Sequence, residues 1–349
     1  MGETMRAAVL RELKTKLKIE RLPIPEPGPG EILVKVAACG VCHSDLHAVD
    51  GDWTPGPNLP LIPGHEVTGH VAEIGPGVPS GVTGFAQGDT VGVPWMWSAC
   101  GRCESCLAGM ETVCRDGEAT GYSKPGGYAE YLLARADFVA RLPKNADLLG
   151  VAPILCAGVT TYRGLKRSNA RPGQWMAVLG IGGLGHIAVQ YAVAMGMRVA
   201  AVDIDPKKLA LAKKLGAEVL VDARQEKPVS ALRKETGGGA HGAVVAAVAT
   251  PAFEQSIGML RPGGTVVFLG LPGGKADELR TSIAAISGRE LSVRGSSVGT
   301  RLDLEEAVAF ALRGTVAAKI ETAPLARAND VLDRMRQGRI VGRVVLKIA

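Results

Sequence analysis

The pattern of apolar and polar positions changes once along this chain, near Pro172. Before that point, short strand-like apolar runs alternate with clusters of proline and glycine, a pattern typical of strands joined by turns. We predict strands at Arg6–Leu10, Glu31–Ala37, Val67–Ile74 and Asp89–Val93. The first 150 residues are therefore expected to form a small β-rich barrel that carries functional loops.

From Pro172 onward, apolar strands and apolar helical patterns follow one another in turn. This order predicts an α/β domain with a doubly wound parallel sheet. The predicted strands are Trp175–Leu179, Arg198–Val202, Glu218–Val221, Gly242–Val248 and Thr265–Leu269, and the predicted helices are Ile187–Ala194, Pro206–Leu215 and Pro251–Leu260. The chain then adds a strand at Leu291–Arg294, helices at Asp303–Leu312 and Arg327–Gln337, and a strand at Val344–Ile348.

Composition limits the classes of protein to consider. The 349 residues, 46% of them hydrophobic, are enough for two domains with separate cores. The net charge of +6 is modest and the basic residues are scattered, which argues against nucleic acid as the main partner. The sequence contains no uninterrupted apolar run of about 18 residues, so we do not predict a membrane span. Because the N-terminus lacks the pattern of a secretory signal, we predict a cytoplasmic protein.

Four of the seven cysteines, Cys100, Cys103, Cys106 and Cys114, lie in one segment with the spacing C-x2-C-x2-C-x7-C. In a cytoplasmic chain this spacing indicates a metal site and not disulfides. Four thiolates complete the tetrahedral coordination of zinc, as in a closed structural site. An iron–sulfur cluster also takes four cysteines, but the glycines and charged residues between them favour an exposed zinc lobe. Cys39 is expected to be buried or spare.

A second group of metal-binding residue types surrounds Cys42 and His65. Thiolate sulfur and neutral imidazole suit zinc, and a catalytic zinc keeps three protein ligands and one open position. The third ligand must come from elsewhere, and Cys156 is the only cysteine outside the early region and the four-cysteine segment. We therefore predict a catalytic zinc site at Cys42, His65 and Cys156.

A G-x-G-x-x-G pattern from Gly180 to Gly185 follows a predicted strand and opens a predicted helix. In this context Gly180 permits a tight turn, Gly182 lets the backbone approach a pyrophosphate, and Gly185 lets the helix lie close to the strand. The helix N-terminus then offers free amides to the phosphates. Asp203, at the end of the next strand, would accept from the ribose hydroxyls and repel a 2′-phosphate, which favours NAD over NADP. Gly183 and Leu184 complete the loop, and Lys208 either reaches the ribose or is a solvated surface lysine.

With these patterns in this order, the chain resembles the zinc-dependent medium-chain alcohol dehydrogenases over essentially its whole length, and most closely their bacterial and yeast tetrameric branch. The resemblance rests on Cys39 to His47, Gly51 to Trp53, Pro63 to Glu66, the four-cysteine segment, Gly121-Tyr122, Gly126 to Glu130, Cys156 to Thr160, Gly180 to Gly185 and Gly342-Arg343. The chain departs from its closest relatives in a longer loop around Pro79 to Gln87.

The resemblance implies a GroES-like catalytic domain built from both chain ends, with a Rossmann NAD-binding domain inserted between them. The expected bounds are 1–152 and 289–349 for the catalytic domain, with a structural zinc lobe at about 96–116, and 153–288 for the Rossmann domain. Two zinc ions per subunit and a homotetramer are also implied.

The resemblance assigns roles to the residues around the predicted catalytic zinc. Glu66 matches a carboxylate near the metal, and Asp45 matches the acceptor that orients His65. Ser44 matches the hydroxyl that takes the alcohol proton, and His47 matches the outer end of a proton relay that passes through the cofactor ribose. Trp53 and Trp95 match positions that line the alcohol pocket, and the implied cofactor contacts are His43, Thr160, Leu269, Ser296, Val298 and Arg343.

The implied activity is that of an alcohol:NAD oxidoreductase that reversibly oxidises small primary alcohols, such as ethanol, to aldehydes. Two indole rings leave a narrow pocket, which disfavours bulky or secondary substrates. A related zinc dehydrogenase for secondary, polyol or aromatic alcohols is the main alternative. A non-catalytic NAD-binding or redox-sensing protein is a second, and the retention of all three zinc ligands with Ser44 and His47 argues against it.

Overall fold

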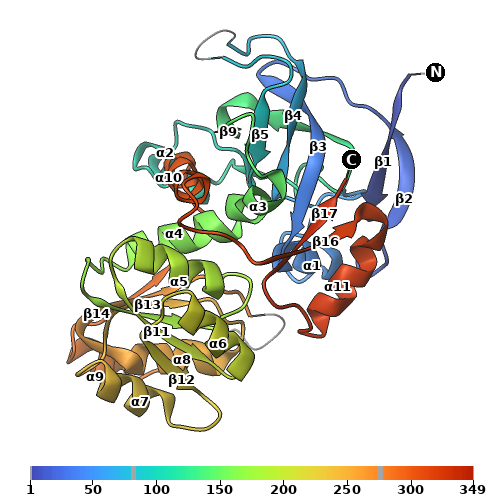
Figure 1. The fold of residues 1–349 in the computed structure, drawn as a ribbon. Coiled ribbons are helices and arrows are strands. Elements are labelled where there is room, and N and C mark those ends of the chain that lie inside the picture. The colour runs from blue at the N-terminus through green and yellow to red at the C-terminus, as the bar shows by residue number, and fades with distance from the viewer. Residues whose placement is uncertain (1, 80–83, 273–277, 349) are drawn as a thin grey trace. The chain divides into compact units, whose positions relative to one another are not determined.

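The computed structural model describes residues 2–79, 84–272 and 278–348. The chain divides into two compact units, of which the first comprises Met1–Cys156, Thr300–Leu312 and Ala318–Ala349 and the second Ala157–Gly299 and Arg313–Ala317 (Figure 1). The first unit therefore combines both ends of the chain. Residues 80–83, in the longer loop noted from the sequence, lie outside the described residues.

The first unit is built around a seven-stranded sheet in the order β16-β17-β3-β4-β5-β9, with β8 also paired to β3. Only β16 and β17 pair in parallel; the other neighbours in this sheet are antiparallel. Its strands are β3 (Glu31–Val41), β4 (Val67–Ile74), β5 (Thr90–Val93), β8 (Tyr131–Arg135), β9 (Ala140–Leu142), β16 (Ile320–Pro324) and β17 (Arg343–Lys347). Two smaller sheets pair β1 (Thr4–Val9) with β2 (Lys18–Pro23) and β6 (Met96–Ser98) with β7 (Glu118–Ala119).

The strand β3 is the centre of this unit because three other strands pair with it. Its last four residues, Ala38 to Val41, are buried. Ile32, Val34 and Val36 belong to the same apolar core as Leu346 of β17. Burial of this apolar surface stabilises the unit and fixes the end of β3, from which the chain enters the candidate site.

The first unit also contains short helices at the margins of its sheets. They are α1 (His43–Asp50), α2 (Glu104–Leu107), α3 (Leu148–Val151), α10 (Arg301–Leu312) and α11 (Ala328–Arg336), with 3-10 turns η1 (Glu111–Val113), η2 (Ala136–Phe138), η3 (Ala152–Leu155) and η4 (Leu325–Arg327). The sequence pattern predicted α10 and α11. It did not predict α1, whose residues were read only for their roles around the predicted catalytic zinc and the cofactor.

The second unit is a six-stranded parallel sheet in the order β12-β11-β10-β13-β14-β15. The strands are β10 (Trp175–Leu179), β11 (Arg198–Asp203), β12 (Val219–Asp222), β13 (Ala240–Val245), β14 (Leu260–Phe268) and β15 (Ser292–Gly295). All five residues of β10 are buried, as expected for a strand covered on both faces. This is the strand order of the Rossmann fold.

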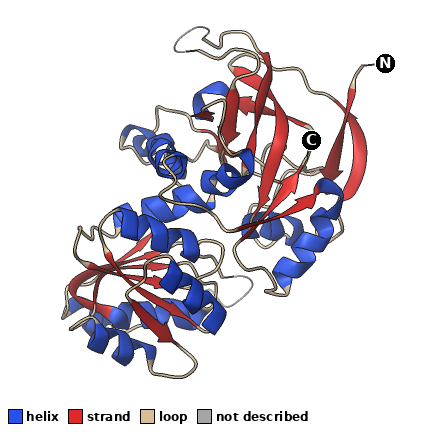
Figure 2. Ribbon diagram, viewed as in Figure 1, coloured by secondary structure: helices blue, strands red, loops and turns tan. Residues whose placement is uncertain are grey.

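Helices cover both faces of this parallel sheet, as Figure 2 shows. They are α4 (Ala157–Arg167), α5 (Gly185–Ala194), α6 (Pro206–Lys214), α7 (Pro228–Glu235), α8 (Thr250–Met259) and α9 (Ile283–Ser287). Helix α6 begins where the sequence predicted, with Asp205 accepting from the amide of Lys207 (2.8 Å) and Pro206 at the first helical position. The predicted combination of a GroES-like β-rich domain and a Rossmann sheet is confirmed.

The structure and the sequence pattern differ at two places in the second unit. The predicted strand Gly242–Val248 ends at Val245, because the amides of Ala246 and Ala247 both turn back to the carbonyl of Leu179. The predicted domain boundary at residue 289 lies before β15, whereas β15 pairs with β14 in the parallel sheet and the compact unit extends to Gly299. Helices α4, α7 and α9 were not predicted.

Among the described residues, no single helix is long and apolar enough to cross a membrane. One bent pair, Leu148–Leu155 with Ala157–Arg167, meets the length and composition requirements together.

We expect Gly69→Ala to destabilise the first unit. A methyl group at Gly69 would overlap the carbonyl oxygen of Lys35, which belongs to the neighbouring strand β3 and cannot move away freely. Overpacking of this kind costs about 1–3 kcal/mol. Thermal unfolding should show a lower midpoint for Gly69→Ala than for Gly56→Ala, whose added methyl group meets nothing within 4 Å. Equal midpoints for the two variants would contradict the expectation.

Candidate functional site

Cys42 lies between the end of β3 and the start of α1. Its backbone amide donates to Oδ2 of Asp45 (2.8 Å), the third residue of the helix. This contact fixes the first turn of α1 and satisfies a buried amide that no helical carbonyl can reach. The thiol of Cys42 is therefore presented from a rigid strand-to-helix corner.

The Asp45 carboxylate, which is only 1% exposed, joins three segments of the first unit. Besides the Cys42 amide, Oδ2 accepts from the Tyr128 hydroxyl (3.1 Å). Oδ1 accepts from the amide of Gly64 (3.1 Å) and lies 3.0 Å from Nδ1 of His65. A buried carboxylate is stable only when its oxygens have such partners. The Asp45 carboxylate therefore lies beside Nδ1 of His65, where the resemblance implied an acceptor.

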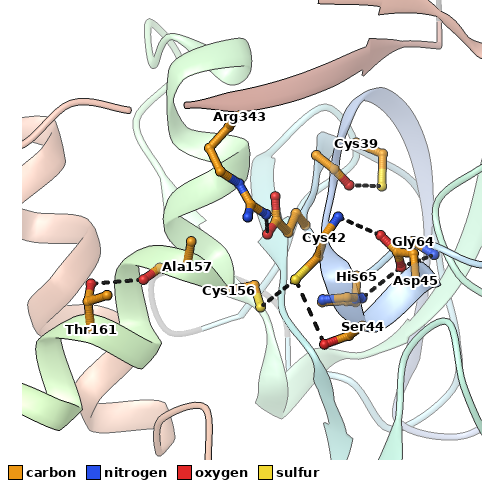
Figure 3. Close-up of polar contacts among 12 residues, drawn as sticks. Cys39, Cys42, Ser44, Asp45, Gly64, His65, Cys156, Ala157, Thr161 and Arg343 are labelled. Carbon is orange, nitrogen blue, oxygen red and sulfur yellow. Dashed lines mark hydrogen bonds and ion pairs between the residues drawn. The ribbon is translucent and has the colours of Figure 1, made fainter. Parts of the chain in front are cut away.

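Four side chains of metal-binding residue types converge beside this carboxylate, and Figure 3 labels three of them, Cys42, His65 and Cys156. One ligand atom from each of Cys42, His65, Glu66 and Cys156 lies within 4.8 Å of the others, and all four residues are buried. The two sulfur atoms are 3.9 Å apart. His65 Nε2 has no hydrogen-bond partner within the part of the chain that the structure describes. The predicted ligand set is therefore brought together from three distant stretches of sequence.

The donor set fits zinc. Two thiols and one imidazole are the ligand types of a catalytic zinc, and an unpartnered buried Nε2 is otherwise costly. Burial lowers the pKa of His65, but the charges of Asp45 and Cys42 outweigh burial and raise the pKa to about 10. Contact with Cys156 lowers the pKa of the Cys42 thiol, against the effect of burial. Metal binding would therefore displace a proton from His65.

Glu66 faces Arg343, which comes from the start of β17, and the two side chains form a fully buried ion pair. Burial raises the pKa of Glu66 to about 8, and the guanidinium of Arg343 opposes that rise. Nε of Arg343 has no hydrogen-bond partner among the described residues. Arg343, assigned by resemblance to the cofactor phosphate, thus has a carboxylate partner and one free donor.

Ser44 and His47 follow Cys42 on α1. Ser44 Oγ lies 3.8 Å from Cys42 Sγ, so its hydroxyl borders the metal donors. His47 is one helical turn further along and 8% exposed, and its Nδ1 lies 2.7 Å from Oδ2 of Asp52. Both residues are therefore on the helix that the Asp45 contacts fix.

Aromatic rings form one wall of this region. The rings of Trp53 and Trp95 are 6.1 Å apart and edge to face, and Tyr122 lies within 5.8 Å of both. Trp95 meets the His65 ring edge to face at 4.8 Å. The two predicted pocket tryptophans are therefore neighbours of each other, and Trp95 is also a neighbour of the donor His65. Aromatic pairs at these distances stabilise their mutual arrangement.

The four-cysteine segment forms a separate donor cluster. One sulfur atom from each of Cys100, Cys103, Cys106 and Cys114 lies within 4.8 Å of the others, and all are half-buried. The amide of Cys103 donates to the sulfur of Cys100 (3.3 Å), and backbone amides of residues 102 and 103 lower the pKa of Cys100 to about 6. All seven cysteines are free thiols, so no disulfide competes with metal binding. Cys39 is fully buried and belongs to neither cluster.

In the second unit, the glycine loop joins β10 to α5. Gly180 has φ +85°, and a methyl group there would lie 2.7 Å from the Ala247 amide nitrogen. Gly182 has open space around it, whereas a methyl group at Gly185 would overlap the carbonyl of Gly180. These three positions match the needs of a tight turn, an approaching pyrophosphate and a close helix.

Asp203 ends β11 beside this loop. Its Oδ2 accepts from the amide of Ile181 (2.6 Å), and its Oδ1 accepts from the amides of Ile204 (2.7 Å) and Asp205 (2.9 Å). The carboxylate is 7% exposed and its position is fixed by these three bonds. A negative charge is therefore held at the place where the ribose of a dinucleotide binds in this fold.

The remaining predicted cofactor residues lie on different elements. In the first unit, His43 is exposed on α1. In the second unit, Thr160 is buried in α4, Lys208 is half-buried on α6, Leu269 is buried after β14, and Ser296 and Val298 follow β15. Val298 has φ +39°, a strained backbone for a β-branched residue and a feature often found at functional sites.

Three polar or aromatic neighbours of the site were not assigned from the sequence. They are Asp52 beside His47, Tyr122 beside the tryptophans, and Tyr128 beside Asp45. All three belong to stretches on which the family resemblance rests, namely Gly51 to Trp53, Gly121-Tyr122 and Gly126 to Glu130. Their contacts depend on chain segments that meet only in the fold.

Comparison with known proteins supports this picture. Residues 28–144 match the alcohol dehydrogenase GroES-like domain, and residues 183–313 match the zinc-binding dehydrogenase family. The alcohol dehydrogenase of Moraxella sp. (strain TAE123) is 52% identical over 98% of this chain and 99% of its own length. An alcohol dehydrogenase of Geobacillus stearothermophilus is also 52% identical, over 99% of both chains.

Solved structures agree with these sequence matches. The alcohol dehydrogenase of the hyperthermophilic archaeon Aeropyrum pernix has a TM-score of 0.88 at 36% identity and covers 98% of this chain and 100% of its own. Two structures that are 28% identical contain a nicotinamide cofactor. A zinc-binding dehydrogenase from Sinorhizobium meliloti 1021 is bound to NADP; it has a TM-score of 0.89 and covers 99% of this chain and 100% of its own. Acetophenone reductase from Geotrichum candidum is in complex with NAD; it has a TM-score of 0.86 and covers 100% of this chain and 98% of its own.

The family matches cover most of the chain, and relatives at 52% identity align with nearly all of it. The family uses zinc and NAD(P), and both the thiol-rich donor set and the glycine loop described above suit these groups. This chain therefore belongs to the zinc-dependent medium-chain alcohol dehydrogenases.

Proposed function

We propose that the enzyme oxidises small primary alcohols with NAD at a catalytic zinc held by Cys42, His65 and Cys156. One observation carries this proposal: two buried thiols and an unpartnered imidazole nitrogen converge at a site bordered by Ser44 and by an aromatic wall. Zinc at these three ligands would supply a Lewis acid that lowers the pKa of an alcohol hydroxyl. Glu66, which Arg343 neutralises, is the fourth donor of the cluster.

The side chains of α1 then hold and move the proton. Ser44 Oγ is placed to accept the hydroxyl proton of an alcohol, because it lies beside the ligand thiol of Cys42 and is only half-buried. His47 passes the proton outward at its Nε2, since Nδ1 already faces Asp52. Asp45 keeps the first turn of this helix in place while His65 stays oriented.

The aromatic wall supports a preference for small substrates. Trp53, Trp95 and Tyr122 are mutual neighbours, and the Tyr122 hydroxyl is anchored to the carbonyl of Pro55 (2.7 Å). Large rings that hold one another in place cannot move aside for a branched or bulky chain without losing their contacts. The alternatives from the sequence, secondary, polyol and aromatic alcohols, are tested below.

Asp203 supports NAD over NADP. Three backbone amides hold its carboxylate at the end of β11, where a 2′-phosphate would meet a fixed negative charge. The residues that follow, Ile204 and Asp205, supply no arginine that could bind such a phosphate. We assign the cofactor contacts predicted from the sequence, including Thr160 and Lys208, to the same NAD site.

The four-cysteine lobe is proposed to hold a second, structural zinc, because four thiols leave no open position for substrate. We also propose a homotetramer in the cytoplasm, an assembly and a location that rest on the resemblance to the bacterial and yeast branch.

The first experiment is a substrate and cofactor panel with zinc-replete enzyme. Initial rates of NADH formation should be highest with ethanol and 1-butanol and at least 10-fold lower with 2-propanol and benzyl alcohol, because the aromatic wall restricts width. NADP should support less than a tenth of the rate with NAD, because Asp203 repels the 2′-phosphate. Faster turnover of 2-propanol or benzyl alcohol would refute the narrow pocket, and absence of turnover with every alcohol would refute the proposed activity.

Metal analysis separates the two proposed zinc sites. We expect two zinc ions per wild-type chain, and one per chain in both Cys156→Ala and Cys106→Ala, because each variant removes one ligand from a different cluster. Cys156→Ala should lose activity and keep most of its thermal stability. Cys106→Ala should have a clearly lower unfolding temperature than wild type, because it disrupts the structural site. Cys39→Ala is the matched control and should keep two zinc ions. If either cluster variant fails to fold, stepwise zinc release by a chelator tests the same count in the wild type.

Replacing the proposed proton acceptor should affect turnover more than cofactor binding. Ser44→Ala is expected to lower kcat about 100-fold, the usual size of a lost acid–base contribution, and to change the Kd for NADH by less than about twofold. Steady-state kinetics and fluorescence titration measure the two quantities. Ser287→Ala removes an exposed hydroxyl on α9 and should change neither. Equal losses of turnover and NADH affinity in Ser44→Ala would contradict the assigned role.

A further inference from the structure

We propose that Asp52 is a positioning residue that holds His47 in the tautomer with a protonated Nδ1, leaving Nε2 free to accept the substrate proton. The inference rests on the proposed function, in which His47 is the outer end of the proton path. It adds a residue to which neither the sequence pattern nor the family resemblance gave a role.

The local fold brings Asp52 back to the helix that carries His47. Helix α1 ends at Asp50, and Gly51 adopts the left-handed conformation (φ +67°, ψ +38°) that reverses the chain. The amide of Asp52 then donates to the carbonyl of His47 (3.1 Å), five residues earlier. Asp52 is therefore tied to His47 through its backbone as well as its side chain. This double attachment limits how far the carboxylate can move away.

The side-chain contact is short and places one specific nitrogen against an acceptor. Oδ2 of Asp52 lies 2.7 Å from Nδ1 of His47, whose side chain is 9% exposed, whereas the Asp52 side chain is 32% exposed. An ionised carboxylate only accepts hydrogen bonds, so the proton of a neutral imidazole must lie on Nδ1. Nε2 then carries the lone pair, and it is the only ring atom that can take up a proton from the substrate side.

The other neighbours of the His47 ring do not compete for Nδ1. The ring packs against Trp53 (5.0 Å between centroids), and the ring of His43 lies 6.4 Å away. The next carboxylate, Asp50, points to a different partner: Arg336 of α11 donates to both of its oxygens (2.7 and 3.2 Å). Within residues 2–79, 84–272 and 278–348, Asp52 is the carboxylate that sets the His47 tautomer.

Without Asp52 the imidazole would be free to place its proton on Nε2. A ring with a protonated Nε2 cannot accept there, so each turnover would wait for the minority tautomer or for a ring flip. Asp52 therefore contributes to turnover by acting through His47, while it touches neither substrate nor metal.

Nitrogen NMR tests the tautomer directly in the zinc-replete holoenzyme. The chain has six histidines, so a spectrum of histidine-labelled protein is simple, and His47→Gln assigns the His47 signals by their loss. Wild-type His47 at a pH where the ring is neutral should show a protonated Nδ1 and a bare Nε2. Asp52→Ala should show a mixture or a protonated Nε2. Asp52→Asn should keep Nδ1 protonated, because the amide oxygen can still accept.

Kinetics with a primary alcohol provides the second readout. Asp52→Ala should lower kcat by about 10- to 100-fold, at or below the lower limit for complete loss of a general base because His47 itself remains, with KM for alcohol and NAD changed less than about threefold. Asp52→Asn should recover most of the lost kcat. Asp50→Asn removes the same charge two residues away and should leave the tautomer and kcat within about twofold of wild type.

Two outcomes would overturn the proposal. One is a wild-type spectrum in which Nδ1 of neutral His47 carries no proton, or an Asp52→Ala spectrum in which Nδ1 stays protonated as in wild type. The other is equal loss in Asp52→Asn and Asp52→Ala accompanied by a raised KM, which would indicate that Asp52 only supports the loop carrying Trp53. Failure of the wild-type enzyme to oxidise any alcohol would instead refute the proposed function, and the spectra would still decide whether Asp52 fixes the ring.

Discussion

The candidate site depends on one buried carboxylate, that of Asp45. Its two oxygens meet the amides of Cys42 and Gly64, the hydroxyl of Tyr128 and the ring of His65, so three chain segments share a single negative charge. Removing that charge would leave several buried donors without an acceptor, each costing about 1–3 kcal/mol. Removing the donors would leave an uncompensated charge in the core. The corner at Cys42 and the orientation of His65 are therefore coupled.

The two thiols and the imidazole of the candidate site come from different structural settings around this carboxylate. Cys42 stands at a strand-to-helix corner, His65 leads into β4, and Cys156 follows the 3-10 turn η3. A second buried pair, Glu66 with Arg343, adds the start of β17 to the same region. The chain uses both of its ends here because the central strand β3 pairs with β17 from the C-terminus and with β4 from the N-terminal half. Rigid packing of these strands holds the donors close without the help of a disulfide.

The cofactor loop is held by a second carboxylate that works in the same way. Asp203 accepts three backbone amides and so connects the end of β11 to the glycine loop after β10. In both units, then, a buried acidic side chain organises nearby backbone before any ligand is present. Preorganised groups of this kind lose little freedom when the ligand arrives, which favours tight and specific binding.

The sequence by itself determined the fold class, the two donor sets and the nucleotide loop. Runs such as Trp175–Leu179, the four-cysteine spacing and the glycine pattern are local signals, because a strand, a metal lobe and a phosphate turn each need particular residues at fixed separations. The helix at His43–Asp50 was not predicted because it is short and its many polar residues leave no clear helical spacing of apolar residues. Only the tertiary structure decided that Tyr128 reaches Asp45, that Tyr122 joins two tryptophans and that Arg343 pairs with Glu66. Contacts between residues 83 or 277 positions apart in the chain leave no periodic trace in the sequence, since they depend on how sheets and turns pack in three dimensions.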